Sequence, residues 1–209
     1  MIFYDCSTAP SPKRARMFIA EKGLEIETRE ISIMAGDQLK PEFLAINPFA
    51  TIPVLVTDDG TAFTENNGIA AYLEAAFPEP PLLGTTPEET GLVWMWNSIC
   101  EFHLGQPVSE ALRNGNPHMA GRALTGQRNI EQIPALAERG LARIDDFYTL
   151  LEKRLQDSEW VALDRFSMVD ITAYVFVSFT RVVKKSIPDA NTATQNWFQR
   201  MKSRPSASL

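Results

Sequence analysis

The sequence has few cysteines, and they do not form a pattern. Cys6 and Cys100 lie far apart, so they fit neither a CxxC motif nor the spacing of metal ligands. A disulfide framework is therefore not indicated, and a reducing compartment suits this cysteine content. We expect a cytoplasmic protein that needs no metal.

The sequence also lacks basic clusters and long hydrophobic runs. The formal net charge is −6 at pH 7, and the most basic segment, residues 181–185, is interrupted by two valines. Proteins that bind nucleic acids usually present a basic face. No apolar run approaches the roughly 20 residues of a membrane span, and the first residues do not have the pattern of a signal peptide. We expect neither nucleic acid nor membrane among the partners.

What is present is ordinary globular composition. The chain has 209 residues, of which 44% are hydrophobic and 22% charged. This length is enough to bury a substantial core, and it suits one large domain or two small ones.

The first part of the chain alternates between strand and helix signals. Residues 2–4 form an apolar run typical of a strand. Pro10 lies where proline is tolerated, in the first turn of a helix, and Gly23 ends that helix. A second strand at residues 26–31 would pair in parallel with the first through a right-handed crossover.

Further strand and helix signals follow up to residue 77. The pattern predicts a short helix at 40–46, a strand at 53–56, a tight hairpin at Asp59-Gly60 and a returning strand at 61–63. Thr64 would cap a helix that runs to about Phe77. This order predicts a small mixed sheet with helices on its faces.

The segment from Pro78 to Pro87 contains four prolines and reads as a linker. Beyond it only helices are predicted, at residues 88–112, 123–155, 167–184 and 190–202. The last but one begins at Ser167-Met168-Val169-Asp170, which has the form of a capping box with Asp in place of Glu. We predict one domain at 1–78 and an all-helical domain at 88–209, joined by a linker at 79–87.

Three motifs resemble those of glutathione transferases. Residues 47–55, NPFATIPVL, resemble the NP-x-x-x-IPVL signature, and residues 64–69, TENNGI, resemble the x-E-S-x-A-I segment. Residues 166–171, FSMVDI, are similar to the F-S-x-A-D-I motif of the helical domain. The resemblance implies an α/β thioredoxin-like domain followed by an all-α bundle, glutathione as co-substrate, and a homodimer.

The resemblance implies that the first two motifs bind glutathione. Pro53 would be cis, and Ile52, with Thr51 before it, would pair its backbone with the cysteinyl part, as in edge-strand peptide capture. The alternative for Pro53 is a trans proline that starts a strand. Glu65 and Asn66 would bind the γ-glutamyl carboxylate at a helix N-terminus.

Asn66 stands where the family has a Ser. Its amide can still donate a hydrogen bond, although the residue could also serve only as a helix cap. Gln38 and Lys40 match the region near the glycyl carboxylate of glutathione. For Lys40, a solvated surface charge is the alternative interpretation.

The glutathione thiol must become a thiolate to react, and most members place a Tyr, Ser or Cys after the first strand to stabilise it. Here that position is Ala9, which has no side-chain donor. Ser11, at the start of the first helix, is one candidate replacement, where its hydroxyl and the helix dipole could both act. Ser7 and Cys6 lie on the same loop, and Tyr4 is expected in the core.

A second set of candidates lies on the long helix of the second domain. His103 and Ser109 are six residues apart, which puts them on different faces of an unbroken helix. A kink at Pro107 would bring both toward one cleft. This arrangement resembles an atypical fungal type, also found in bacteria, in which a Ser and a His hold a water against the thiolate. The alternatives are a histidine bonded to a backbone carbonyl and a serine bonded to the previous turn.

The expected activity is transfer of glutathione to a small hydrophobic electrophile. Trp94, Trp96 and Phe102 could line the electrophile pocket, or they could be core residues. Two other functions remain open. One is a protein that binds glutathione or a hydrophobic ligand without turnover. The other is reduction of peroxides or disulfides through glutathione, which would be favoured if Cys6 formed a mixed disulfide.

Overall fold

The computed structural model describes all residues from 1 to 209, and they form two compact units. The first, called the sheet unit here, comprises residues 1–80, 125–128 and Leu209. The second, the helical unit, comprises residues 81–124 and 129–208. The division at residues 80 and 81 falls inside the segment predicted as a linker. Each unit is described by itself.

The sheet unit contains a four-stranded mixed sheet in the order β2-β1-β3-β4. Its strands are β1 (Ile2–Asp5), β2 (Glu27–Glu30), β3 (Val54–Val56) and β4 (Ala62–Phe63). β1 pairs in parallel with β2 and antiparallel with β3, and β3 pairs antiparallel with β4. The parallel pair and the hairpin at Asp59-Gly60 were both predicted from the sequence.

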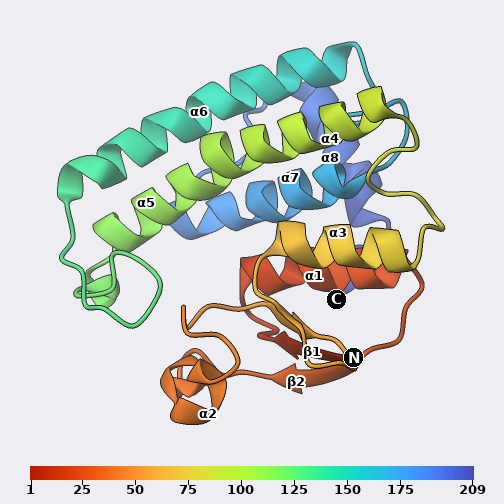
Figure 1. Cartoon of the computed structure of the whole chain (residues 1–209). Coiled ribbons are helices and arrows are strands. Elements are labelled where there is room, and N and C mark those ends of the chain that lie inside the picture. Colours follow the sequence, from red (N-terminus) through yellow and green to blue (C-terminus); the bar gives the residue numbers. More distant parts are fainter. The chain divides into compact units, whose positions relative to one another are not determined.

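The helices of this unit cover the sheet on both faces. They are α1 (Pro10–Glu21), α2 (Pro41–Leu44) and α3 (Asn66–Ala76), with a short 3₁₀ turn η1 (Asp37–Leu39) before α2. α1 and α3 lie side by side on one face (Figure 1). On the other face Phe43 of α2 packs edge-on against Tyr4 of β1, with ring centroids 5.9 Å apart. Because side chains of a strand alternate between faces, the neighbouring Phe3 is buried on the side of α1.

The start of α3 differs from the prediction. The cap position is Glu65, with extended backbone, instead of Thr64. Helical backbone therefore begins at Asn66, which places the side chain of Asn66 in the first turn.

The helical unit contains no strand. Its helices are α4 (Pro87–Cys100), α5 (Gln106–Gly115), α6 (Pro134–Gln156), α7 (Met168–Phe179) and α8 (Thr192–Lys202). A π-helical turn, η2 (Glu101–Gly105), joins α4 to α5, and 3₁₀ turns occur at η3 (Pro117–Met119), η4 (Thr180–Val183) and η5 (Pro205–Ser208). The predicted fold class, a mixed sheet domain followed by an all-helical domain, is confirmed.

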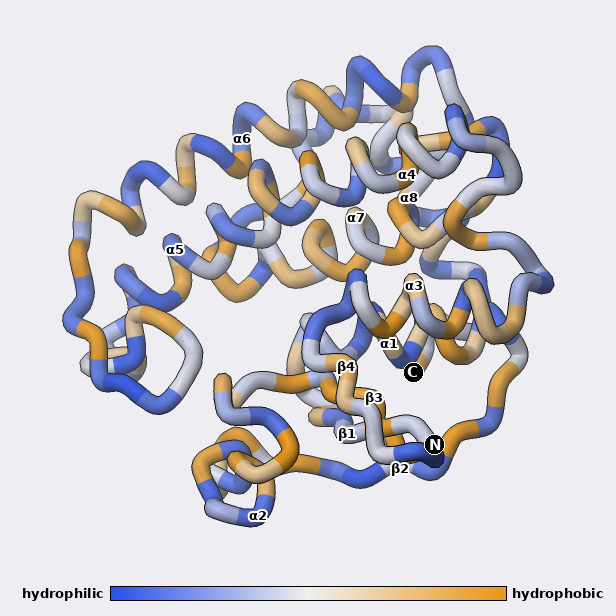
Figure 2. The backbone as a smooth tube through the Cα atoms, viewed as in Figure 1, coloured by the Kyte–Doolittle hydropathy of each residue, from blue (hydrophilic) through white to orange (hydrophobic).

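The helix predicted at 123–155 begins late, and the prediction is wrong for its first part. α6 starts at Pro134, because proline is favoured in the first turn. The residues before it form an irregular loop in which Gly121 and Gly126 adopt positive φ, a conformation that a helix excludes. Along α6 itself, hydrophobic and hydrophilic stretches alternate (Figure 2), and its buried side chains include Ile144, Phe147 and Leu151.

The capping box at the start of α7 is confirmed. Ser167 accepts a hydrogen bond from Val169 N, and Asp170 accepts one from Ser167 N. Asp170 is fully buried and also accepts from Val161 N and Trp197 Nε1, both at 3.0 Å. Burial raises the pKa of the Asp170 carboxyl, and these hydrogen bonds oppose that shift. One carboxylate thus connects α7, α8 and the loop after α6. No helix of the chain is both long and apolar enough to span a membrane.

Candidate functional site

The turn before β3 carries the predicted backbone-pairing residue. The Ile52–Pro53 peptide bond is cis, as predicted. The β1–β3 ladder ends at the Tyr4–Val54 pair, and no other backbone group bonds to Ile52. The N–H and C=O of Ile52 therefore have no backbone partner within the protein.

Asn47 holds this turn from within, and sequence reasoning gave it no role. Its Nδ2 donates to the carbonyl oxygen of Thr51 at 2.7 Å and to Thr51 Oγ1 at 3.0 Å. Its Oδ1 accepts from Phe49 N at 3.0 Å. Between them Ala50 takes a left-handed conformation with φ of 54°. The Asn-Pro dipeptide is the only sequence signal, since Asn side chains commonly bond to backbone two residues on.

Glu65 and Asn66 lie at the N-terminus of α3, as the motif implied, but they differ in environment. Glu65 is exposed, whereas Asn66 is only 5% exposed. Asn66 Nδ2 donates to Ser11 Oγ at 2.9 Å, and Ser11 belongs to the first turn of α1. The structure thus joins two residues that the sequence assigned to different parts of glutathione.

The two residues proposed near the glycyl carboxylate are partly engaged within the protein. Lys40 is exposed, and its ammonium lies 2.6 Å from Asp37 Oδ1. The hydrogen bond with Asp37 raises the pKa of Lys40, and the same hydrogen bond lowers the pKa of Asp37. Gln38 keeps its side-chain Oε1 buried without a partner. The carboxylate of Asp37 therefore partly offsets the positive charge of Lys40.

The residues of the loop after β1 that were considered as donors to the thiolate differ in burial and in hydrogen-bond partners. Ala9 is the N-cap of α1 and offers no side-chain bond. The Ser7 hydroxyl donates to Glu30 at 3.0 Å. Cys6 is 3% exposed, and its Sγ lies 3.4 Å from Thr8 Oγ1. Tyr4 is a core residue, 9% exposed, as predicted. Of the residues with a side-chain donor, only Ser11 begins a helix.

Asp5 and Arg16 fix this loop, and no motif in the sequence indicated their pairing. Arg16 Nη1 donates to both carboxylate oxygens of Asp5, at 2.7 and 2.6 Å. Asp5 Oδ1 also accepts from Cys6 N at 2.8 Å. Since Asp5 is only 3% exposed, the ion pair ties the end of β1 to α1.

His103 and Ser109 lie on either side of an irregular turn in the long helix. At the place where the sequence predicted a kink, the helix has a π-helical turn, in which Gln106 N donates to Glu101 O. Pro107 has no N–H to continue this pattern, so the carbonyl of Phe102 would lack its partner. Arg143 of α6 donates to that carbonyl. The helix continues through the irregularity and does not end at it.

The side chains of His103 and Ser109 are available to a ligand. His103 is exposed and Ser109 half-buried, and no hydrogen bond in the structure uses the imidazole or the hydroxyl. The alternatives considered from the sequence, a histidine bonded to a carbonyl and a serine bonded to the preceding turn, do not occur. π-Helical turns are frequent at functional sites.

The aromatic residues of this helix are not core residues. Phe102 is 61% exposed, and Trp94 and Trp96 are half-buried. The guanidinium of Arg154 lies 5.6 Å from the centre of the Trp96 ring. No group of three or more His, Cys, Asp or Glu side chains could hold a metal ion.

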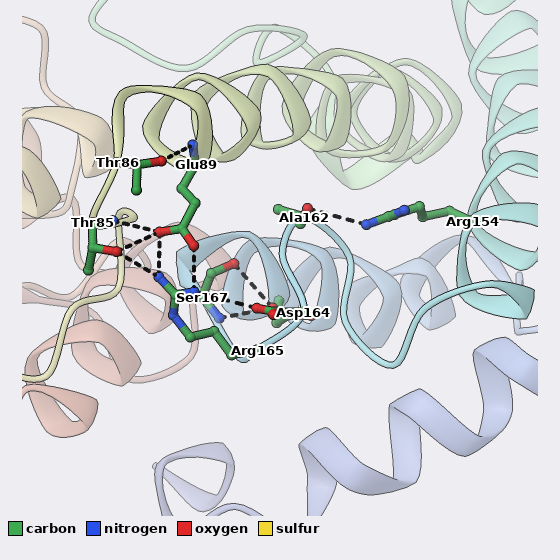
Figure 3. Close-up of polar contacts among 9 residues, drawn as sticks. Thr85, Thr86, Glu89, Arg154, Ala162, Asp164, Arg165 and Ser167 are labelled. Carbon is green, nitrogen blue, oxygen red and sulfur yellow. Dashed lines mark hydrogen bonds and ion pairs between the residues drawn. The ribbon is translucent and has the colours of Figure 1, made fainter.

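A polar cluster also occurs at the start of the helical unit. Arg165 donates two hydrogen bonds to the carboxylate of Glu89, at 2.7 and 2.6 Å. Both are drawn as dashed lines in Figure 3. The same carboxylate accepts from the backbone and hydroxyl of Thr85. Arg165 and Thr85 hold the pKa of Glu89 well below its usual range. The cluster fixes the beginning of α4 to the loop before α7.

Comparison with known proteins agrees with this architecture. Residues 9–76 match the family model described as glutathione S-transferase, N-terminal domain, and residues 134–200 match glutathione S-transferase, C-terminal domain. Glutathione S-transferase 2 of Saccharomyces cerevisiae is 36% identical over 208 residues, which cover 99% of this chain and 87% of the relative.

Solved structures show the same similarity. The crystal structure of Gtt2 from Saccharomyces cerevisiae has a TM-score of 0.90 and 33% identity, covering 100% of this chain and 99% of the other. A class Gtt2 glutathione S-transferase of Vibrio parahaemolyticus has a TM-score of 0.83 and 30% identity, covering 99% and 95%. With the cis proline turn and two-unit fold described above, these matches establish that the chain belongs to the cytosolic glutathione S-transferase family and that its sheet unit is the thioredoxin-like domain.

Proposed function

We propose that the protein transfers the thiolate of glutathione to the electrophilic carbon of a small hydrophobic compound. The observation that carries this proposal is the unused pair of His103 and Ser109 in a transferase whose usual thiolate donor is replaced by Ala9. A member that only stored glutathione would have no need for free donors on a π-helical turn.

Glutathione binding in the proposal uses the sheet unit. The free peptide groups of Ile52 pair with the cysteinyl backbone, beside Thr51 and Pro53. The γ-glutamyl carboxylate lies at the N-terminus of α3, where Glu65 and Asn66 begin the helix and its unpaired N–H groups favour an anion.

The glycyl carboxylate in the proposal lies near Gln38 and Lys40. Lys40 carries the positive charge, and the amide of Gln38 supplies a hydrogen-bond donor.

The thiolate in the proposal is stabilised by hydrogen bonds and helix dipoles. A water held by His103 and Ser109 donates to the sulfur, and the N-terminus of α1 adds its partial positive charge. Ser11 is a further donor at that N-terminus. The thiol proton leaves to solvent, and the sulfur electron pair then forms the carbon–sulfur bond. The leaving group departs, or an added proton completes the reaction.

The proposal includes a homodimer, which members of the family usually form. Leu92 and Met95 of α4 and Phe102 of η2 are 41%, 47% and 61% exposed. Their spacing of three and seven residues puts them along one side of the helix. A second copy of the chain, or a hydrophobic substrate, would cover such a stripe. Sedimentation with Met95→Glu as the variant distinguishes them, because only a dimer would dissociate.

The test of the proposed function is the ultraviolet difference spectrum of bound glutathione across pH. The wild type should bind glutathione with a thiolate pKa well below the free value. The His103→Ala/Ser109→Ala variant should keep glutathione affinity but move that pKa toward the free value and lose conjugation. Binding without a lowered pKa would instead support a non-catalytic binding protein. Reduction of peroxides or disulfides through glutathione would be favoured if Cys6 formed a mixed disulfide and Cys6→Ala abolished turnover. Because Cys6 is buried, we expect Cys6→Ala to leave turnover unchanged.

A further inference from the structure

Two helices of the sheet unit begin next to each other, and one side-chain hydrogen bond joins them. Ser11 lies in the first turn of α1 and Asn66 in the first turn of α3. The bond runs from Asn66 Nδ2 to Ser11 Oγ over 2.9 Å, between residues 55 positions apart. The first turn of α3 has N–H groups without an intrahelical partner, and in the first turn of α1, where Pro10 and Pro12 have no N–H, Ser11 supplies one, so the pair lies at the positive ends of two helix dipoles.

The direction of this bond determines what Ser11 can do. A serine hydroxyl has one proton to donate and two lone pairs to accept with. Asn66 occupies a lone pair, and no protein group accepts the Ser11 proton. The hydroxyl proton is therefore free, and a hydroxyl that accepts one hydrogen bond becomes a better donor in another.

The other hydroxyl on this loop does not have this freedom. Ser7 donates its proton to Glu30 at 3.0 Å, and its backbone N–H bonds to the same carboxylate. Ser7 is also exposed, whereas Ser11 is half-buried beside a residue that is 5% exposed. A half-buried hydroxyl donates to an anion more strongly, because less water competes.

We propose that Asn66 is a positioning residue, which fills a lone pair of Ser11 and so directs the Ser11 hydroxyl proton to the sulfur of bound glutathione. The inference rests on the proposed function, and it adds a role for Asn66 beyond binding the γ-glutamyl carboxylate. The two roles are compatible, since the amide nitrogen carries two protons and Ser11 takes one. Asn66 thus connects the anionic end of glutathione to the donor at its sulfur.

The buried environment of Asn66 supports this orientation. The amide oxygen Oδ1 is buried and has no hydrogen-bond partner in the protein. Such an atom is costly, and native structures contain few of them. The amide of Asn66 is nevertheless oriented with its NH₂ group toward Ser11 and its oxygen unpaired. In this orientation Ser11 accepts from Asn66, so its own hydroxyl proton stays available.

The decisive variant is Asn66→Asp, which keeps the size of the side chain but reverses the hydrogen bond. A carboxylate can only accept, so the Ser11 proton turns toward residue 66 and away from glutathione. The pKa of the bound thiolate, read by ultraviolet difference spectra, should rise by about one unit, the scale of one hydrogen bond to a charged group. Ser11→Ala should give a similar rise, and the Asn66→Ala/Ser11→Ala double variant no more than Ser11→Ala.

Two control variants separate this role from charge and from folding. Asn67→Asp puts the same charge on the next residue of α3 and should move the thiolate pKa much less. Ser7→Ala removes the hydroxyl that is committed to Glu30 and should not move it. Ser11→Thr retains a hydroxyl and should restore the low pKa, which a purely structural role would not require. Thermal unfolding of each free variant verifies the fold.

Several outcomes would overturn the inference. Asn66→Asp with a wild-type thiolate pKa contradicts it, as do Asn66→Ala and Ser11→Ala effects that simply add. In either case, if the wild type still lowers the pKa of the bound glutathione thiol, the proposed function is unaffected. A wild-type protein that binds no glutathione would overturn the proposed function itself, and with it this inference.

Discussion

The side-chain amide of Gln127 donates a hydrogen bond of 2.6 Å to the carbonyl oxygen of Pro48, 79 residues away in the sequence. Gln127 belongs to residues 125–128, which form part of the sheet unit. Next to it Gly126 has φ of 113°, and a Cβ there would lie 3.5 Å from the carbonyl oxygen of Phe49. The turn that precedes Ile52 is thus held by Asn47 on one side and by Gln127 on the other.

The first prediction concerns this contact. Gln127→Ala should weaken glutathione binding about 3- to 10-fold, since a neutral hydrogen bond contributes on the order of 1 kcal/mol. The turnover at saturating glutathione should change little, because the turn orients the peptide and not the sulfur. Isothermal titration and steady-state kinetics measure the two effects.

Gln106→Ala is the matched control, because the Gln106 amide donates only to Glu110 on its own helix, at 3.3 Å. Gln127→Lys retains a donor and should keep most of the affinity. Equal losses in both glutamine variants, or a loss confined to turnover, would contradict a role for Gln127 in holding the turn.

The second prediction concerns the pH dependence of stability at Glu89. Its pKa is lower in the folded protein than the ordinary value of 4.5, chiefly through the hydrogen bond with Arg165. A lowered carboxyl pKa contributes stability that is complete above the unfolded-state pKa and is lost as the pH falls toward the folded-state pKa. Glu89→Gln should therefore be less stable than wild type at pH 7, with a gap that narrows below about pH 4.5.

Thermal unfolding of both proteins between pH 7 and pH 3 measures this gap. Glu88→Gln is the control, because Glu88 is in the same first turn of α4 and forms no ion pair. The Glu88 variant should show a small gap that arises from the helix dipole alone. If the stability difference between wild type and Glu89→Gln were the same at pH 3 as at pH 7, side-chain packing and not the ion pair would be responsible.

The third prediction concerns the buried capping box. Asp170→Ala removes the acceptor for Val161, Ser167 and Trp197 and leaves their donors buried. The free energy of unfolding should fall by about 3 kcal/mol or more, since each unsatisfied buried donor costs about 1–3 kcal/mol. Denaturant unfolding measures the change.

Thr86→Ala provides the comparison, because Thr86 caps α4 at an exposed position, accepting from Glu89 N at 3.2 Å. Its loss should cost only about 1 kcal/mol. If the two variants lost similar stability, the Asp170 carboxylate would be acting as a simple cap and not as a connection between helices.

Sequence reasoning succeeded where the determinants are local. The capping box at Ser167 and Asp170 spans four residues, and the hairpin that contains Asp59-Gly60 closes between Thr57 and Thr61. The resemblance to known motifs identified the cis Pro53 turn. These features depend on short-range backbone chemistry, which a single sequence contains.

Sequence reasoning failed where two interacting residues are far apart in the chain. Nothing near Gln127 indicates that it bonds to Pro48, and Ser11 and Asn66 were predicted separately, without the bond between them. The predicted helix from residue 123 overlooked Gly126, which has a positive φ and lies in the sheet unit close to the carbonyl oxygen of Phe49. Tertiary contacts of this kind override helix propensity.

The last prediction concerns the packing of α5 on α6. A Cβ at Gly140 would lie 2.6 Å from the carbonyl oxygen of Pro107 and 2.9 Å from Ala111 N. Both atoms belong to the backbone of α5, so neither can move aside as a side chain could. Gly140→Ala should therefore push the helices apart and cost about 1–3 kcal/mol, as overpacking does.

Gly91→Ala in α4 is the matched control, since a Cβ there would meet nothing within 4 Å. Alanine should raise stability at that position by up to about 1 kcal/mol, because glycine is the poorer helix former. Because Pro107 follows the π-helical turn that carries His103, the Gly140 variant should also reduce conjugation more than its stability loss explains. Retained activity in a destabilised Gly140→Ala protein would show that the geometry of this turn does not depend on α6.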